Sequence, residues 1–385
     1  MKFFRISGLK DLASMYSSTA VGNGISAIFW FFLASEISPG EYGSLFYFIG
    51  IANIIAGISL VGTNNALIVF ISKNVNLQFT LNFISLISVV VLSVITVIIF
   101  QRLDVGLLAV GYVVYSLGLA DLLGRKFYGN YSKNYFLQKL LTLLIGISLY
   151  FLVGIESILY ALVLTYIPLL YRIYIGFRDS RLDWKLLSMR RGFILNNYFM
   201  NLILVFWAQI DKVILPPILG LVILGNYNLA LQAIGIMIVI PSTFFRYILP
   251  QDSSGNDTKK LKIGITIISV LLTILGITVL PIIMSTVFPE YEEVDNAIRI
   301  MSLAVIPSTL NVLYTSKLLG NEKSRIVLYG TLSSLITITF GMIILGQLIG
   351  LEGIAISWVL AVVIQFLIFK IFERFYNKGT LGIFS

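Results

Sequence analysis

Few side chains in this sequence could do chemistry, and most of those lie inside long apolar stretches. Cysteine and histidine are both absent from the 385 residues, so the chain has no thiolate nucleophile, disulfide, Cys/His zinc site or imidazole proton shuttle. The ionisable candidates inside apolar stretches are Asp121, Asp211 and Lys212. A charge in hydrocarbon costs about 2.5–3.5 kcal/mol on insertion scales, so each of these residues needs a partner or a role.

The neighbours of these charges suggest structural explanations. Asp121 precedes Arg125 by four residues, a spacing that predicts an ion pair on one helix face, with a cation-binding carboxylate as the alternative. Asp211 and Lys212 are adjacent, and adjacent helix positions point about 100° apart. We therefore expect them not simply to neutralise each other; Asp211 would form an inter-helix bond and Lys212 would extend to the membrane surface.

Amide side chains are concentrated in two pairs of apolar stretches, one in each half of the chain. Such clustering is typical of a polar cavity, and inter-helix hydrogen bonding is the alternative for any single amide. The candidate cavity residues are Asn23, Asn64 and Asn65 in the first half, and Asn197, Asn201, Gln209, Asn226 and Gln232 in the second. Tyr128, Tyr131 and Tyr135 are expected at the membrane interface.

The elements that carry these residues are predicted to be membrane-spanning helices. Hydrophobic residues make up 58% of the chain and charged residues only 12%, against about 25% charged in a soluble domain. Stretches of about 20 apolar residues recur throughout, and each is long enough to cross a hydrocarbon core about 30 Å thick. We expect spans at 12–34, 44–72, 80–100, 105–124, 134–154, 155–177, 192–219, 222–248, 261–287, 296–319, 325–348 and 351–372.

The basic residues predict the orientation of these spans. With both termini in the cytoplasm, all but three of the 27 Lys and Arg residues lie on the inner side; the exceptions are Arg102, Arg299 and Lys212. The sequence thus predicts a multi-pass protein of the plasma or inner membrane. The net charge of +9 is explained by a basic face beside anionic lipid headgroups, so we expect membrane lipids, and no nucleic acid, as partners.

The two halves of the chain resemble each other at an offset of 185 residues, which places Gly40 on Gly225 and Tyr42 on Tyr227. Glycine suits a tight turn with positive φ, and tyrosine suits the headgroup region. Since the offset contains six spans, both copies share one orientation. The prediction is an all-α membrane protein with 12 helices in two pseudo-symmetric six-helix bundles: lobes at 1–178 and 192–385, joined by a cytoplasmic linker at 179–191. Such lobes suit alternating access to a central cavity.

Three segments carry a resemblance to a known family. SEISPGEYGSLFYF and GISLVGTNNALIVFISK in the first half, and QIDKVILPPILGLVILGNYN in the second, resemble the opening hairpin and seventh span of polysaccharide (O-antigen type) flippases. These belong to the multidrug/oligosaccharidyl-lipid/polysaccharide (MOP) exporter superfamily, whose fold is MATE-like. Ser35 departs from the pattern, because a basic residue is frequent there.

The resemblance implies a transporter that turns a polyprenyl-diphosphate-linked oligosaccharide from the cytoplasmic to the outer leaflet. Lys212 would then bind the diphosphate, Asp211 an ion or sugar hydroxyls, and Arg246 an incoming diphosphate, with snorkelling as the alternative for Arg246. The amides would line the sugar cavity. Asp121 and Asp211 are the candidates for ion coupling, with Na⁺ or H⁺ as the coupling ion, and polysaccharide-assembly proteins are candidate partners.

Two other functions compete with this one. A cation-coupled multidrug or small-molecule exporter of the same fold usually has a carboxylate in its first span, where this chain offers Asn23. A membrane glycosyltransferase would need acidic or His-bearing chemistry in a sizeable outer loop, and the acidic segment 288–297 has no recognisable metal spacing. We therefore expect no enzyme, no cofactor and no metal site.

Overall fold

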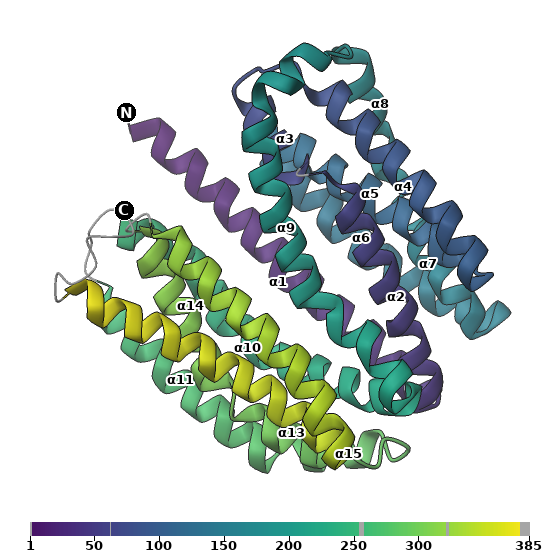
Figure 1. Ribbon diagram of the computed structural model, residues 1–385, viewed down its shortest axis with the longest axis vertical. Helices are drawn as coiled ribbons and strands as arrows, with labels where there is room; N and C mark the ends of the chain where they lie inside the picture. The colour runs from purple at the N-terminus through teal and green to yellow at the C-terminus, as the bar shows by residue number, and fades with distance from the viewer. Residues whose placement is uncertain (1, 62, 254–257, 321–322, 378–385) are drawn as a thin grey trace. The chain divides into compact units, whose positions relative to one another are not determined.

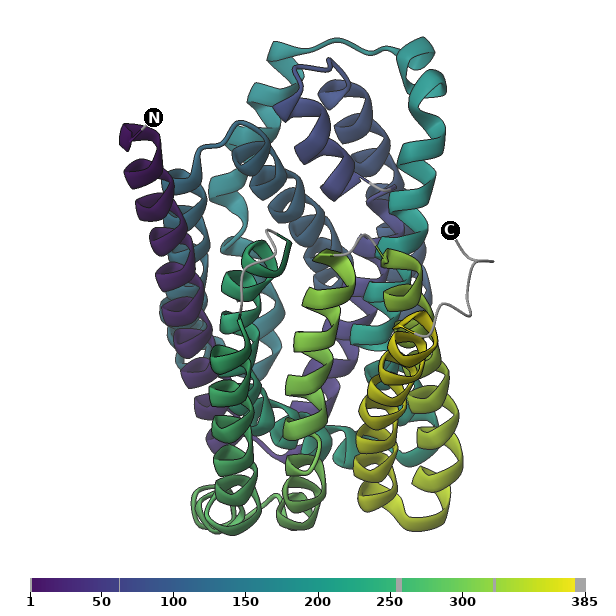
Figure 2. The same cartoon turned by 90° about the vertical axis from the view of Figure 1, so that its left-hand side faces the viewer.

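The computed structural model describes residues 2–61, 63–253, 258–320 and 323–377, and in these ranges the chain is helical and contains no strand (Figures 1 and 2). Ten helices are long and apolar enough to cross a membrane, or eleven when the bent pair of Val294–Ser302 and Val305–Leu319 counts as one span. The predicted all-α membrane fold is thereby confirmed for the described residues. The count of twelve spans stays a prediction.

The chain divides into two compact units. Unit 1 consists of Met1–Phe32 and Leu45–Ile210, and unit 2 of Leu33–Ser44 and Asp211–Ser385. The helices that lie mainly in unit 1 are α1 (Lys2–Glu36), α2 (Pro39–Ser59), α3 (Thr63–Ser72), α4 (Gln78–Phe100), α5 (Leu103–Gly124), α6 (Tyr128–Val153), α7 (Ile158–Leu164), α8 (Leu170–Asp179) and α9 (Trp184–Leu219). Those of unit 2 are α10 (Leu221–Ser253), α11 (Lys259–Thr278), α12 (Leu280–Val287), α13 (Val294–Ser302), α14 (Val305–Gly320) and α15 (Ser324–Asn377). The predicted lobes with their linker at 179–191 stay a prediction.

Helix α4 shows how these helices divide their surfaces between protein and lipid. Its buried positions include Gln78, Asn82, Ser85, Ser93 and Thr96, which recur at helical spacing. Its exposed positions are aliphatic: Ile87, Val90, Val91, Val94, Ile95, Ile98 and Ile99. A helix in water would present the opposite pattern. The polar stripe of α4 therefore faces the interior of unit 1, and the aliphatic face is suited to lipid.

Helix α5 lies at the centre of unit 1, where it packs against α3, α4, α6, α7 and α8. Glycines on α5 let its neighbours approach closely: a Cβ at Gly111 would lie 2.7 Å from the ring of Tyr166, and one at Gly124 would lie 2.7 Å from Ile71. Small residues at such contacts are typical of helix packing in membranes. Because α5 is fixed by its neighbours, it holds Asp121 and Arg125 in place at its C-terminal end.

Helix α15 is interrupted in the middle. Its 54 residues would extend about 81 Å if straight, far more than the roughly 30 Å of a hydrocarbon core. Ile349 and Gly350 have non-helical angles, and Gly350 has a φ of 59°, which favours glycine. The halves before and after this break run side by side in opposite directions (lime and yellow in Figures 1 and 2). The break falls between the predicted spans 325–348 and 351–372.

The N-terminal turns of α2 and α10 pack backbone to backbone inside unit 2. A Cβ at Gly225 would overlap the carbonyl oxygen of Pro39, and a Cβ at Gly43 would overlap that of Leu221. Gly225 lies within a helix, and the glycine with positive φ is Gly220, at 89°. The prediction that Gly225 serves a tight turn was therefore wrong, because its role is close helix contact.

The predicted interfacial place of the two repeat tyrosines was also wrong. Tyr42 and Tyr227 have no exposed surface, so neither ring can meet lipid headgroups; the Tyr42 ring packs edge-on against Tyr291, with the ring centroids 6.0 Å apart. The preceding turn is ordered by a capping box: the Ser38 backbone N–H donates to the Glu41 carboxylate at 3.0 Å, and the Glu41 N–H donates to the Ser38 hydroxyl at 3.4 Å.

We expect Gly225→Ala to lower the free energy of unfolding by about 1–3 kcal/mol, because the added methyl group must displace the backbone of Pro39. The matched control is Gly235→Ala on the same helix, where an added Cβ meets nothing within 4 Å. Thermal unfolding of the purified protein in detergent would measure both. Equal melting temperatures for the two variants would contradict the close contact.

Candidate functional site

Asp121 is the centre of a polar network at one end of unit 1. Its side chain is 2% exposed and accepts a bond from the Arg125 Nε at 2.7 Å, as the i+4 spacing predicted. The Gln78 amide nitrogen donates to the same carboxylate oxygen at 2.9 Å, and the Arg172 guanidinium lies 3.7 Å from the other oxygen. Each oxygen of the Asp121 carboxylate thus faces a guanidinium, and these two cationic neighbours disfavour a bound cation at Asp121.

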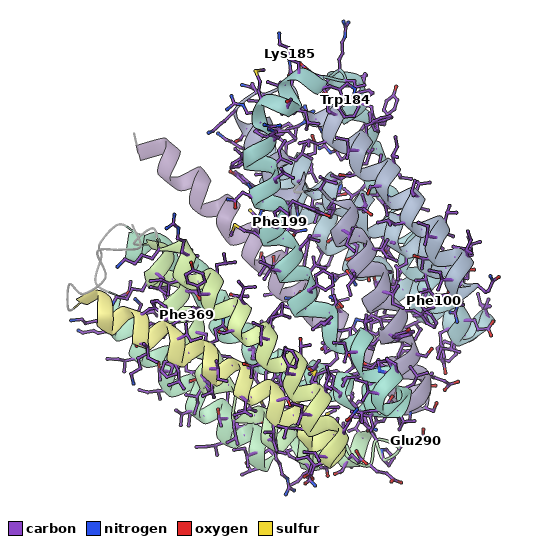
Figure 3. All side chains as sticks on the ribbon, in the orientation of Figure 1. Phe100, Trp184, Lys185, Phe199, Glu290 and Phe369 are labelled. Carbon is purple, nitrogen blue, oxygen red and sulfur yellow. The ribbon has the colours of Figure 1, made fainter. Side chains whose placement is uncertain are left out.

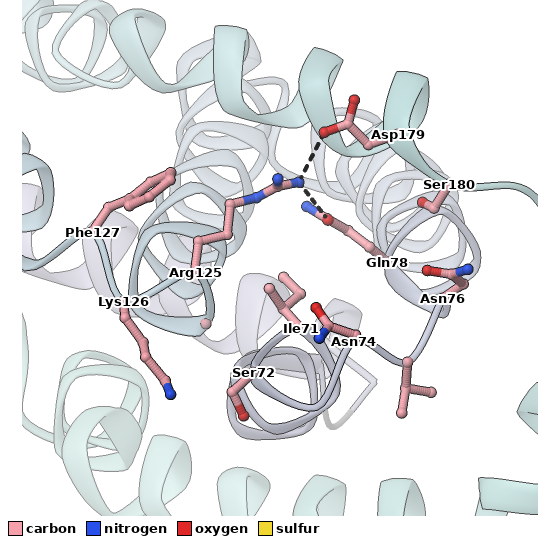
Figure 4. Close-up of a pocket in the computed structure, with 12 residues that line it drawn as sticks. Ile71, Ser72, Asn74, Asn76, Gln78, Arg125, Lys126, Phe127, Asp179 and Ser180 are labelled. Atoms are coloured by element: carbon pink, nitrogen blue, oxygen red, sulfur yellow. Dashed lines mark hydrogen bonds and ion pairs between the residues drawn. The ribbon is translucent and has the colours of Figure 1, made fainter.

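Arg125 joins three helices across a pocket. Besides Asp121 on its own helix, it donates to Gln78 of α4 and to Asp179 of α8, each at 3.2 Å (Figure 4). Burial lowers the pKa of Arg125, but its bonds to Asp121 and Asp179 outweigh this effect, so the pKa is raised above its ordinary value. The pocket has a volume of about 420 Å³ and is lined by Ile71, Ser72, Asn74, Val75, Asn76, Gln78, Gly124, Arg125, Lys126, Phe127, Asp179 and Ser180.

The segment between α8 and α9 is hydrogen-bonded to the start of α4. The Phe79 backbone N–H donates to the Ser180 hydroxyl at 2.8 Å, and the Asp183 N–H donates to the Thr80 hydroxyl at 2.9 Å. Trp184 and Lys185 then begin α9 (Figure 3). Part of the predicted linker is therefore fixed to unit 1, and the rest continues into a long helix.

A second polar group lies between α1 and α6 within unit 1. The Tyr135 hydroxyl donates to the Asn23 side-chain oxygen at 2.8 Å, so this tyrosine takes part in an inter-helix contact. Its predicted place at the membrane interface stays a prediction. A Cβ at Gly22 would lie 3.0 Å from the Tyr135 ring and 3.2 Å from the Lys139 Cγ. The Lys139 ammonium lies 5.8 Å from the centroid of the Tyr135 ring. Lys139 therefore packs along this contact.

Asp211 and Lys212 form a pair inside unit 2. The Lys212 Nζ lies 3.3 Å from the Asp211 Oδ1, and the Lys212 backbone N–H donates to the same oxygen at 2.8 Å. Both side chains are largely buried, with 8% of Asp211 and 13% of Lys212 exposed. The expectation that adjacent positions would keep them apart was wrong, because the flexible lysine stem folds back onto its neighbour.

The predicted cavity amides are divided between the two units. Asn23, Asn64, Asn65, Asn197, Asn201 and Gln209 belong to unit 1, whereas Asn226 and Gln232 belong to unit 2. The side-chain nitrogens of Asn197 and Asn226 donate to carbonyls one turn earlier in their own helices. Arg246 was predicted to meet substrate, and its side chain lies outside the described residues. The role of these residues as a substrate cavity stays a prediction.

Sequence reasoning missed Gln78, Asn82, Arg172 and Lys139. Gln78 and Asn82 could have been found from their spacing, since i and i+4 share a face and polar residues on a lipid-exposed helix face inward. Asn82 is fully buried, and its side-chain atoms have no hydrogen-bond partner.

Among the described residues, no group of three or more acidic side chains could hold a metal ion.

Comparisons with known proteins identify the fold. No family model matches the chain, and no curated protein matches its sequence. A search of solved structures finds an inward-facing multidrug resistance MATE family transporter of the MOP superfamily, with a TM-score of 0.69 and 14% identity over 95% of this chain and 96% of that one. The chain therefore has the fold of a MOP-superfamily membrane transporter.

Two further structures extend this similarity. The lipid II flippase MurJ in an inward closed conformation has a TM-score of 0.66 and 14% identity over 95% of this chain and 87% of that one. An outward-facing MATE family transporter has a TM-score of 0.61 and 15% identity, and the match covers 97% of this chain and 96% of that one. The resemblance to the superfamily is confirmed at the level of the fold, which is shared by drug exporters and a lipid flippase.

We expect Asp121→Asn to destabilise unit 1, because it removes the charge that balances Arg125 and Arg172. Loss of one partner from a buried pair costs about 3–5 kcal/mol, and less here because Arg125 is 26% exposed. Arg178→Gln is the control, since its pair with Asp179 is exposed and worth less than about 1 kcal/mol.

Chemical unfolding of purified protein would compare these two variants. A stable Asp121→Asn variant that has lost transport would contradict the structural role of the network and would favour Asp121 as an ion-coupling residue.

Proposed function

We propose that this protein is a flippase that moves a polyprenyl-diphosphate-linked oligosaccharide from the cytoplasmic to the outer leaflet by alternating access. The fold that it shares with MATE transporters and with the lipid II flippase MurJ supports a flippase or an exporter. The charges inside the helices favour the flippase.

The observation that carries this proposal is the pairing of the buried carboxylates. Of the two carboxylates predicted inside apolar stretches, Asp121 bonds to Arg125 and Asp211 bonds to Lys212. A cationic drug needs a carboxylate that can turn towards it, and both of these are already neutralised by a basic partner. An anionic diphosphate needs basic and neutral polar groups instead, and the interior is rich in amides and hydroxyls.

Coupling to Na⁺ or H⁺ is part of the proposal. Asp211 is the better candidate for this role than Asp121, because one lysine opposes it while two guanidiniums surround Asp121. We also propose that both termini lie in the cytoplasm, where the basic residues face anionic lipid. Polysaccharide-assembly proteins are the proposed protein partners.

The transport prediction is tested in liposomes that carry a fluorescent polyprenyl-diphosphate glycan. We expect protein-dependent movement of the glycan between leaflets, measured as a change in its protection from an external quencher, and stimulation by an ion gradient that Asp211→Asn abolishes. Protein-free liposomes control for spontaneous movement. Export of a hydrophobic cation without movement of the glycolipid would reject the flippase and support the drug exporter.

The orientation is tested with single cysteines, for which the chain is suited because it contains none. Asn76 and Glu292 are both exposed, in segments predicted to lie inside and outside respectively. In intact cells we expect a membrane-impermeant maleimide to label Glu292→Cys and to spare Asn76→Cys, which reacts only after permeabilisation. The reverse pattern would overturn the proposed orientation.

A further inference from the structure

The pocket beside Arg125 lies where three connections between helices meet at one end of unit 1. They are the segments between α3 and α4, between α5 and α6, and between α8 and α9. The distribution of basic residues predicts that all three lie in the cytoplasm. The volume of about 420 Å³ falls within the roughly 300–1,000 Å³ of pockets that hold whole small molecules. The pocket therefore has space for a ligand of the size of a lipid headgroup.

The walls of this pocket are tied to one another by hydrogen bonds. The Arg125 Nη2 donates to the Gln78 side-chain oxygen and to the Asp179 carboxylate, each at 3.2 Å (Figure 4). The Ser180 hydroxyl accepts the backbone N–H of Phe79 at 2.8 Å. These bonds join all three connections through α4, so the pocket is formed before a ligand arrives. A ligand that binds there does not have to order its walls.

Basic side chains exceed acidic ones in and around the pocket. The charged residues that line it or are bonded to its lining include Arg125, Lys126, Arg172 and Arg178 on the basic side, and Asp121 and Asp179 on the acidic side. Each of the two carboxylates has two guanidiniums within 4.0 Å. The exposed ammonium of Lys126 forms no ion pair in the described part of the chain. The surplus charge is positive, and it favours an anion.

Hydrogen-bond donors suited to phosphate oxygens line the same pocket. Arg125 uses its Nε and Nη2 groups in the bonds described above, and its Nη1 group makes no hydrogen bond in the described part of the chain. Lys126 offers three N–H donors, and the exposed side chains of Asn74 and Asn76 add amide donors. Hydrogen bonds from a guanidinium or an ammonium to phosphate are roughly twice as strong as bonds between neutral groups. The donor set therefore suits a phosphate group.

The pocket also has an apolar side, which favours a lipid over a soluble anion. Ile71, Val75 and Phe127 line it, and the side chain of Phe127 is exposed. Helix α8, whose last residue lines the pocket, exposes Tyr171 and Tyr174, and aromatic residues of this kind are enriched at membrane–water interfaces. The apolar side can contact the glycerol part of a lipid, for which a soluble phosphate has no counterpart.

We infer that this pocket binds the phosphate of an anionic lipid headgroup from the leaflet on its side of the membrane. Arg125 and Lys126 bind the phosphate oxygens, and Phe127 contacts the glycerol part. Basic pockets between helices on the cytoplasmic side are suited to anionic headgroups. The site is separate from the proposed transport function, because a flippase and a drug exporter could both carry it.

Native mass spectrometry of the delipidated protein in a neutral detergent tests the site with three probes: phosphatidylglycerol, the zwitterionic phosphatidylcholine and inorganic pyrophosphate. We expect phosphatidylglycerol to bind more tightly than phosphatidylcholine. Lys126→Gln should weaken binding of phosphatidylglycerol about three- to ten-fold and leave phosphatidylcholine unchanged. The matched control is Lys133→Gln, which removes an exposed lysine of α6 that does not line the pocket.

A second variant changes the charge of the pocket and leaves the hydrogen bonds of Arg125 in place. Asn76→Asp adds a negative charge with little change in size, and it should weaken binding of phosphatidylglycerol about ten-fold or more. Asn130→Asp adds the same charge at an exposed position of α6 outside the pocket lining. Equal affinity of wild type, Lys126→Gln and Asn76→Asp, or equal losses in the two control variants, would overturn the site. Binding of pyrophosphate that depends on Lys126 and Asn76, without a preference for phosphatidylglycerol, would overturn a lipid as the source of the phosphate.

Discussion

The structure depends above all on the absence of water around its helices. In hydrocarbon each backbone N–H and C=O must be paired within the chain, so a spanning segment is either a helix or a strand of a closed barrel, and the described spans of this chain are helices. The same constraint directs side chains, since a polar group that faces lipid has no partner. Helix α4 follows this constraint along its length: Gln78, Asn82 and Ser85 are buried in the protein, and a row of valines and isoleucines is exposed on the opposite face. The interior polar groups, and therefore the candidate sites, are a consequence of this sorting.

Charge balance decides which of these groups are available to a ligand. Asp121 is surrounded by two guanidiniums, and Asp211 is bound by the adjacent lysine. These contacts use the buried carboxylates for structure, in keeping with the high cost of an unpaired charge in a medium of low dielectric constant. Lys139 is the exception in the described part of unit 1, because its contacts are with a ring and a glycine. Electrostatics inside the helices thus suits an anion better than a cation.

Much of the fold could be predicted from the sequence, because hydropathy alone marks segments that must be helical in lipid. The pair of Asp121 with Arg125 was predictable for a similar reason, since i+4 spacing is local. The contribution of Gln78 and Arg172 to that network depends on how α4 and α8 pack against α5. This packing cannot be read from the spacing of residues along one helix. Tyr42 was misplaced because it packs against Tyr291, which is distant in the sequence and which its own neighbours do not reveal. Lys139 was hidden among the basic residues that define the orientation.

The glycine contact between α2 and α10 has a mechanical consequence. Where Gly225 meets Pro39 and Gly43 meets Leu221, the two helices meet through main-chain atoms, with no side chain between them. Side chains can change rotamer and so absorb a small displacement, but a backbone surface has no such freedom. The first turns of these two helices therefore behave as a single stiff joint. A displacement of one of these turns therefore moves the other by the same amount.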